Sequence, residues 1–276
     1  MAKALLTNVI ISTWSGRKLD KNVTKEIDET HNTVNAGRFN KILINLKPLR
    51  DIQTISQQIR MFFYSKTLNW CDSGPRILPL TSYKDYIKNL EELKRSWEEA
   101  VNIFCQEYNE NIEKAKRNLK GLFNPNDYPS DIRNRFNVEF IFLPFPENIS
   151  TDFRSEVISD SLSDEINKKI KTNVINGLDI ANKDLKFRLQ ENLTKFIEYL
   201  SKENAKNMRN VLLENLKESV QMLESYNFSD NKEIKKLHTS AKRFAKTIPE
   251  MENLKNDDEL RTNTLERAKE LEKLLF

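Results

Sequence analysis

Apolar residues recur at alternating steps of three and four from Tyr86 to Leu119, and this spacing constrains the fold more than any other feature of the chain. Such steps place side chains on one face of an α-helix, which has 3.6 residues per turn. A helix over about residues 82–120 spans roughly 55 Å at 1.5 Å per residue. An apolar stripe of this length needs a partner along its whole length, so we expect long helices that pack together.

A second apolar series of the same kind lies in the second half of the chain. It runs from Leu162 to Leu200, with an interruption expected near Gly177, and resumes from Met208 to Leu223. Asn and Thr neighbours interrupt its apolar seam, which favours an intramolecular helical hairpin or an irregular bundle over a parallel zipper. We therefore expect this second series to cover the first.

Shorter elements surround the two long series. The patterns predict helices over 24–36, 51–69, 232–247 and 257–275 and strands over 4–14 and 138–143. A single strand needs a partner, so we expect the two strands to pair or pack together.

Low glycine and proline content supports a helical fold, because the chain has only five Gly and eight Pro in 276 residues. Sheet-rich and doubly wound folds need more turns and phosphate-loop glycines. We predict a mainly α fold in which long antiparallel helices form a bundle or stalk, with a small α/β head. The head would occupy 1–150 and contain short strands and the long helix at about 82–120, and the helical region 151–276 would pack against it.

Charge and cysteine content exclude several classes of protein. Lys and Arg exceed Asp and Glu by 45 to 41, a surplus too small for a dedicated nucleic-acid binder. Cys71 and Cys105 stand outside any zinc-binding pattern, which fits a reducing compartment. No secretory signal and no apolar run of membrane-spanning length is evident. We expect a cytoplasmic protein with no membrane partner.

The sequence contains no recognisable catalytic constellation. His31 and His238 are the only imidazoles, and neither lies in a metal-ligand or nucleophile motif. We therefore predict a non-enzymatic protein with no catalytic residue, no cofactor and no metal site.

Three segments that we expect to be loops combine aromatic and cationic residues, and they are Trp14–Lys18, Thr67–Pro79 and Asp152–Arg154. The candidate partner-binding residues in these segments are Trp14, Arg17, Lys18, Trp70, Arg76 and Arg154. Arg side chains there can grip a carboxylate or phosphate through bidentate hydrogen bonds. In the alternative reading, each Arg pairs with a local acid, such as Asp72 or Asp152, and only ties its loop to the bundle.

Three basic stretches offer a nucleic-acid alternative. Lys168–Lys171, Lys235–Lys236 and Lys242–Lys246 can contact phosphates from helix faces. Acids lie near each stretch, and no aromatic strand provides a stacking platform. Nucleic acid therefore remains the alternative partner.

Five short motifs carry a resemblance to a known family. They are Ile-Ser-x-Trp-x-Gly-Arg-Lys at Ile11–Lys18, Gly-x-Arg-Ile-Leu-Pro at Gly74–Pro79, Tyr128-Pro129, Leu143-Pro144 and Phe153-Arg154. Their order resembles an uncharacterised family of phage and prophage proteins, a domain of unknown function, over about residues 5–200. Members of that family are associated with genes for MoxR-type AAA ATPases and von Willebrand A-like proteins. The resemblance implies an accessory or adaptor role in the cytoplasm of a host cell.

These observations predict a non-enzymatic, phage-encoded helical interaction or assembly protein, with an AAA ATPase as a candidate partner. We also expect a homo-oligomer, because two apolar stripes of this length exceed what one chain covers with its own helices. One alternative is a nucleic-acid-binding accessory of phage replication or recombination. Another is an inhibitor of a host defence enzyme.

Overall fold

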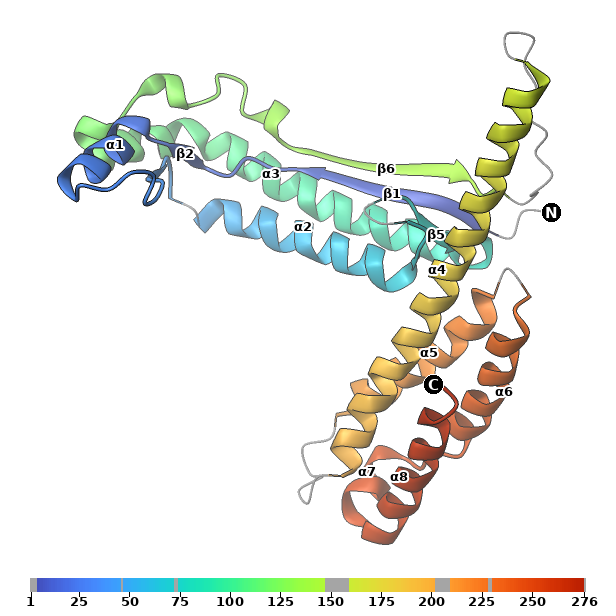
Figure 1. Ribbon diagram of the computed structural model, residues 1–276. Coiled ribbons are helices and arrows are strands. Elements are labelled where there is room, and N and C mark those ends of the chain that lie inside the picture. The colour runs from blue at the N-terminus through green and yellow to red at the C-terminus, as the bar shows by residue number, and fades with distance from the viewer. Residues whose placement is uncertain are drawn as a thin grey trace. The chain divides into compact units, whose positions relative to one another are not determined.

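The computed structural model describes residues 4–45, 47–71, 74–146, 159–201, 209–227 and 230–275 (Figure 1). These residues form a mainly α protein with a small α/β part, as the sequence predicts. The helices are α1 (Lys21–Thr30), α2 (Lys47–Lys66), α3 (Tyr83–Leu119), α4 (Asp160–Leu200), α5 (Asn210–Ser225), α6 (Lys232–Lys246), α7 (Met251–Asn256) and α8 (Asp258–Glu272). The strands are β1 (Ala4–Ser12), β2 (Arg17–Leu19), β3 (Asn40–Ile42), β4 (Leu68–Asn69), β5 (Arg76–Pro79) and β6 (Asn137–Pro144).

The chain forms two compact units. The bundle unit takes in Met1–Thr7, Thr67–Tyr83 and Phe142–Phe276, and the α2–α3 unit takes in Asn8–Lys66 and Lys84–Ile141. This division differs from the boundary that we expected at residue 150. The start of β1 pairs antiparallel with β5, from Ala4 opposite Pro79 to Thr7 opposite Arg76. This pairing assigns residues 4–7 to the bundle unit, whereas the rest of β1 belongs to the α2–α3 unit.

The apolar stripe of α3 forms the core of the α2–α3 unit, and its helical prediction is confirmed. The buried residues of the stripe are Tyr86, Leu90, Trp97, Val101, Phe104, Tyr108 and Ala115. Helix α2 runs antiparallel to α3, because Phe62 stacks on Tyr86 while Ser56, earlier on α2, accepts a hydrogen bond from Trp97, later on α3. Phe136, which precedes β6, packs edge-on against Phe104 and covers the stripe from another side.

The strands partly follow the sequence prediction. One sheet has the order β4-β5-β1-β6, so β1 and β6 are neighbours as expected, and β2 and β3 form a second, antiparallel pair. The expectation of a loop from Thr67 to Pro79 was wrong at β4 and β5, which lie in this segment, and correct for residues 70–71 and 74–75 between them. Gly74 and Pro75 lie in the connection between the two strands, and Pro79 is the last residue of β5.

Helix α4 organises the bundle unit (Figure 1). It continues through Gly177, so the expected interruption was wrong. Its stripe is buried from Ala181 to Leu200, where α4 packs against α5 and α8. Two helices, α7 and α8, follow Pro249 where we expected one.

Gly177 allows Trp70 to pack closely against α4. A Cβ at this position would lie 2.6 Å from ring carbons of Trp70, so the indole rests directly on the backbone of α4. Phe145 packs edge-on against the same indole, with ring centroids 5.3 Å apart. The absence of a side chain at Gly177 therefore sets the distance between α4 and the end of β4.

The α3 stripe, and the α4 stripe from Ala181 to Leu200, are buried by elements of their own units. Residues of α2 and the segment before β6 contact the α3 stripe, while α5 and α8 pack against α4. The start of the second series is not covered in this way, since Leu162 is 43% exposed, and self-association stays a prediction.

Replacing Trp97 by Ala should lower the free energy of unfolding by about 3–5 kcal/mol, because the buried indole would leave a cavity. The indole also donates a 2.8 Å hydrogen bond to Ser56 Oγ. Urea unfolding followed by circular dichroism measures the loss. The control Ile103→Ala, on the same helix at a residue 58% exposed, should cost less than about 1 kcal/mol. Equal losses in the two variants would contradict the packing.

Replacing Gly177 by Ala should lower the melting temperature. Overpacking against the Trp70 ring costs about 1–3 kcal/mol, which outweighs the gain of up to about 1 kcal/mol from alanine in a helix. The control Gly121→Ala should be tolerated, because nothing lies within 4 Å of a Cβ there. Trp70→Leu should cost less in the Gly177→Ala background than alone, and strictly additive effects would refute the contact.

Candidate partner-binding groove

The six candidate residues from the sequence do not gather in one described site. Trp14, Arg17 and Lys18 belong to the α2–α3 unit, and Trp70 and Arg76 belong to the bundle unit. Arg154 lies outside the described residues, as do Asp72 and Asp152.

Trp14 and Lys18 have structural contacts within their unit. The half-buried Trp14 ring packs against Phe104 and Tyr108, with centroids 6.2 and 5.8 Å away. Lys18 Nζ lies 3.5 Å from a carboxylate oxygen of Asp127. Arg17 is exposed on β2. A binding role for these residues stays a prediction.

Lys18 borders a buried charge cluster around Lys41. Lys41 Nζ lies 2.7 Å from Asp127 and 3.1 Å from Asp20, and it donates a hydrogen bond to the carbonyl of Leu122. The hydrogen bond to Asp127 is the main cause that raises the pKa of Lys41. The pKa of Asp20 is lowered, first by the backbone N–H of Val23 and then by Lys41. Because its charges are already matched, this cluster ties β3 to the start of α1 and to the segment after α3.

Arg76 is buried, with 8% of its surface exposed. Its Nε donates to Thr67 Oγ1 at 2.7 Å, and it donates to Thr67 O at 2.9 Å and to the Asn69 side chain. The carboxylate of Asp184 on α4 lies 3.6 Å away. Asp184 also accepts hydrogen bonds from Asn69 N at 2.9 Å and from Arg188 at 3.0 Å. These contacts favour the structural alternative for Arg76, with an acid from α4 in place of the local Asp72.

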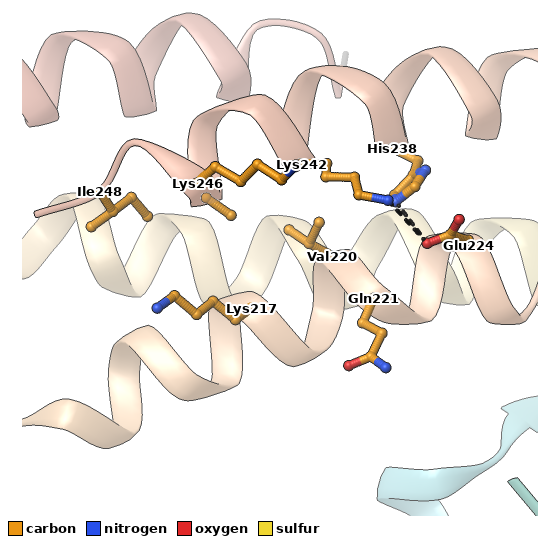
Figure 2. Close-up of a pocket in the computed structure, with 9 residues that line it drawn as sticks. Lys217, Val220, Gln221, Glu224, His238, Lys242, Lys246 and Ile248 are labelled. Atoms are coloured by element: carbon orange, nitrogen blue, oxygen red, sulfur yellow. Dashed lines mark hydrogen bonds and ion pairs between the residues drawn. The ribbon is translucent and has the colours of Figure 1, made fainter.

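A groove between α5 and α6 is the strongest candidate site, and sequence reasoning did not identify it (Figure 2). We call it the basic groove. Its volume is about 380 Å³. The residues that line it are Lys217, Val220, Gln221, Glu224, His238, Lys242, Ala245, Lys246 and Ile248.

Helices α5 and α6 form the walls because each has an apolar face turned to the core. Ile234, Leu237, Ala241 and Phe244 are buried at steps of three, four and three on α6. The side chain of Asn231 begins α6 by accepting hydrogen bonds from Glu233 N and Ile234 N. Side chains that flank the two buried faces therefore meet over the gap between the helices.

The charges of the basic groove are only partly matched. Lys242 and His238 reach from α6 toward Glu224 on α5, at 3.3 and 3.5 Å (Figure 2). Lys217 and Lys246 form no ion pair with any residue that the structure describes. Val220, Ala245 and Ile248 give the groove an apolar floor. The groove thus offers ammonium groups to an anion that carries an apolar neighbour.

The described residues contain no candidate metal site. No group of three or more His, Cys, Asp or Glu residues is placed to hold an ion there.

The basic stretch Lys242–Lys246 was the one sequence signal that pointed to the basic groove. Lys217 and Glu224 escaped notice because their approach to α6 depends on how α5 and α6 pack.

A second hollow, of about 680 Å³, lies in the α2–α3 unit between the end of β3 and the end of α3. Its two cations are Lys114 and Arg117, and Lys114 pairs with Glu110 at 2.6 Å. The second hollow therefore has fewer unmatched charges than the basic groove.

Comparison of the chain with protein-family models, with curated proteins and with solved structures gives no match. Among the helices in the described ranges, none combines the length and the apolar character needed to span a bilayer.

Replacing Arg76 by Ala should lower the free energy of unfolding by more than about 2 kcal/mol, because removal of one partner leaves a buried carboxylate less well compensated. The control Arg17→Ala, at an exposed cation, should change it by less than about 0.5 kcal/mol. Thermal unfolding of both variants measures the difference. An Arg76→Ala protein as stable as the control would instead support a surface binding role for Arg76.

Proposed function

We propose that this protein is a non-enzymatic interaction protein and that its basic groove docks an acidic segment of a protein partner. The observation that carries the proposal is the pair of unmatched cations, Lys217 and Lys246, on opposite walls above an apolar floor. Cations that face each other across a groove hold an anion from two sides. An apolar floor adds contact area that a free inorganic ion would not use.

The groove favours a protein segment over nucleic acid. His238 is the one aromatic ring among the nine residues that line it, and with 14% of its side chain exposed it offers bases little stacking surface. Glu224 lies among the cations and would repel a continuous run of phosphates. A peptide can place a carboxylate near Lys217 or Lys246 and an apolar side chain on the floor, and still avoid Glu224.

Nucleic acid remains the second candidate because α6 contains six Lys or Arg and one Glu. Such a helix attracts polyanions through long-range electrostatics, without sequence preference. Binding of this kind would depend on the whole charge of α6, and the cations outside the groove would contribute as much as those within it.

The family resemblance suggests the setting of this interaction. It would make the chain a phage-encoded adaptor or assembly protein, with a MoxR-type AAA ATPase among its candidate partners. The basic groove supplies a defined surface through which such a partner would bind.

The double variant Lys242→Glu/Lys246→Glu should weaken binding of an acidic, apolar-rich peptide (Glu-Leu-Glu-Glu-Leu-Leu, fluorescently labelled) at least about tenfold, because it reverses the groove's charge. Fluorescence anisotropy at 0.15 M salt with nanomolar peptide measures the dissociation constant. A single-stranded oligonucleotide serves as the comparison probe.

The matched control is Lys236→Glu/Arg243→Glu. It changes the charge of α6 by the same amount at exposed residues that do not line the groove. This control should leave peptide binding within about threefold of the wild type, since exposed charges at a distance are largely screened. Equal losses in both variants, or tight binding of the oligonucleotide alone, would contradict the proposal.

A further inference from the structure

A second groove lies between α5 and α7 and meets the basic groove at Lys217, which lines both. We call it the acidic groove, and its volume is about 400 Å³. The α5 residues that line the two grooves are 210, 213, 214, 217, 220, 221 and 224. This spacing places all of them on one face of the helix, so the two grooves form one continuous groove along α5.

The wall opposite α5 follows the chain in the reverse direction. Near the end of α5, Glu224 lies 3.5 Å from His238 on α6 (Figure 2). Nearer the start of α5, Lys217 shares the basic groove with Lys246 and the acidic groove with Glu250. The charges of the two walls can therefore be compared in order along the groove, from the acidic half at the start of α5 to the basic half at its end.

The acidic groove contains unmatched carboxylates. Glu214 lies on α5 and Glu250 on the opposite wall, and both are exposed. Neither forms an ion pair with a residue in the described part of the chain. Glu252, the third acid of this groove, lies 3.7 Å from Lys255. The acidic groove therefore offers two carboxylates, one from each wall, to a cation.

The unmatched acids are neighbours of the unmatched cations of the basic groove. Glu214 and Lys217 are three residues apart on α5, which is about 4.5 Å along the helix axis. On the other wall, Lys246 and Glu250 are four residues apart. A purely acidic segment that reaches the two lysines brings its remaining carboxylates toward the two glutamates, and a purely basic segment has the reverse difficulty. Only an occupant with both charges is attracted by all four groups.

We propose that the occupant of the groove is a protein segment that carries both charges, with a basic side chain about one helical turn from an acidic one. The inference rests on the proposed function and adds a basic residue to the acidic segment proposed there. The acid of the segment lies between Lys217 and Lys246, and its basic residue lies between Glu214 and Glu250. The order of the two charges sets the direction in which the segment lies along α5.

Apolar residues lie beneath both halves of the groove. Val220 and Ile248 line the basic half, and Leu213 and Met251 line the acidic half. Apolar contact at the centre and charges at the rim are the usual arrangement of protein interfaces. The segment therefore carries apolar side chains between its two charges. Nucleic acid fits this pattern poorly, because it has no cation to place between the two carboxylates.

Three labelled peptides of one length test the inference on the full chain. Lys-Lys-Leu-Leu-Glu-Glu-Leu carries both charges, Glu-Glu-Leu-Leu-Glu-Glu-Leu carries only acids, and Lys-Lys-Leu-Leu-Lys-Lys-Leu carries only bases. Fluorescence anisotropy at 0.15 M salt measures the three dissociation constants. The two-sign peptide should bind at least about fivefold more tightly than either of the others, because attraction replaces repulsion in one half of the groove.

The variant Glu214→Lys/Glu250→Lys makes the whole groove basic. It should reverse the preference, so that the acidic peptide binds more tightly than the two-sign peptide. The matched control is Glu266→Lys/Glu270→Lys, which adds the same charge at exposed residues of α8 that line neither groove. This control should keep the wild-type order of the peptides, since exposed charges at a distance are largely screened.

Several results would overturn the inference. One is equal affinity of the wild type for the two-sign and acidic peptides, and another is a two-sign preference that survives in Glu214→Lys/Glu250→Lys. Sedimentation of the wild type at twice the 32.5 kDa chain mass, lost in the same variant, would also overturn it, because a second copy would then be the occupant.

The peptides separate this inference from the proposed function. Binding of the acidic peptide that depends on Lys242 and Lys246, without any preference for the two-sign peptide, would leave the proposed function standing and remove only the inference. A wild type that binds none of the three peptides would overturn both.

Discussion

The buried carboxylate of Asp184 fixes the geometry on which the bundle unit depends. It accepts hydrogen bonds from the backbone of β4 and from Arg188 one turn along α4, and it faces Arg76 on β5. A carboxylate removed from water needs such donors around it, so α4 can neither slide nor rotate against the strands without a large electrostatic cost. Helices α5 and α8 pack on α4, so the position of α4 fixes theirs. The position of α5 in turn determines where the basic groove lies.

The basic groove along α5 stays open because the charged side chains on its two walls do not pack against one another. Lysine side chains at the rim stay hydrated, and the small residues Val220 and Ala245 beneath them do not fill the gap between the helices. Exposed charges of this kind contribute little to the stability of the isolated chain. In the proposed function they act on binding instead, because the cations attract an acidic partner and Glu224 repels one that places an acid beside it.

Local patterns in the sequence predicted the elements, but the assembly of those elements depends on contacts between distant residues. The stripe from Tyr86 to Ala115 identifies α3 because helical periodicity is a property of neighbouring residues. The contact of Trp70 with Gly177 joins positions more than a hundred residues apart, and nothing near Gly177 distinguishes it from a helix breaker. The groove was missed for the same reason. Its charges come from two helices, and on each helix they look like an ordinary solvated face.

The path of the chain also bears on how the protein is made. The chain passes between its two units after residues 7, 66, 83 and 141, so neither unit is a continuous piece of sequence. The first strand can pair with β5 early, but the helices that complete its core follow Ser159, and the wait for them lasts until more than 150 further residues have left the ribosome. At about 5–20 residues per second this wait lasts on the order of 10 s or longer. An apolar strand exposed for that time is a target for chaperones, and no single cut in the chain releases either unit intact.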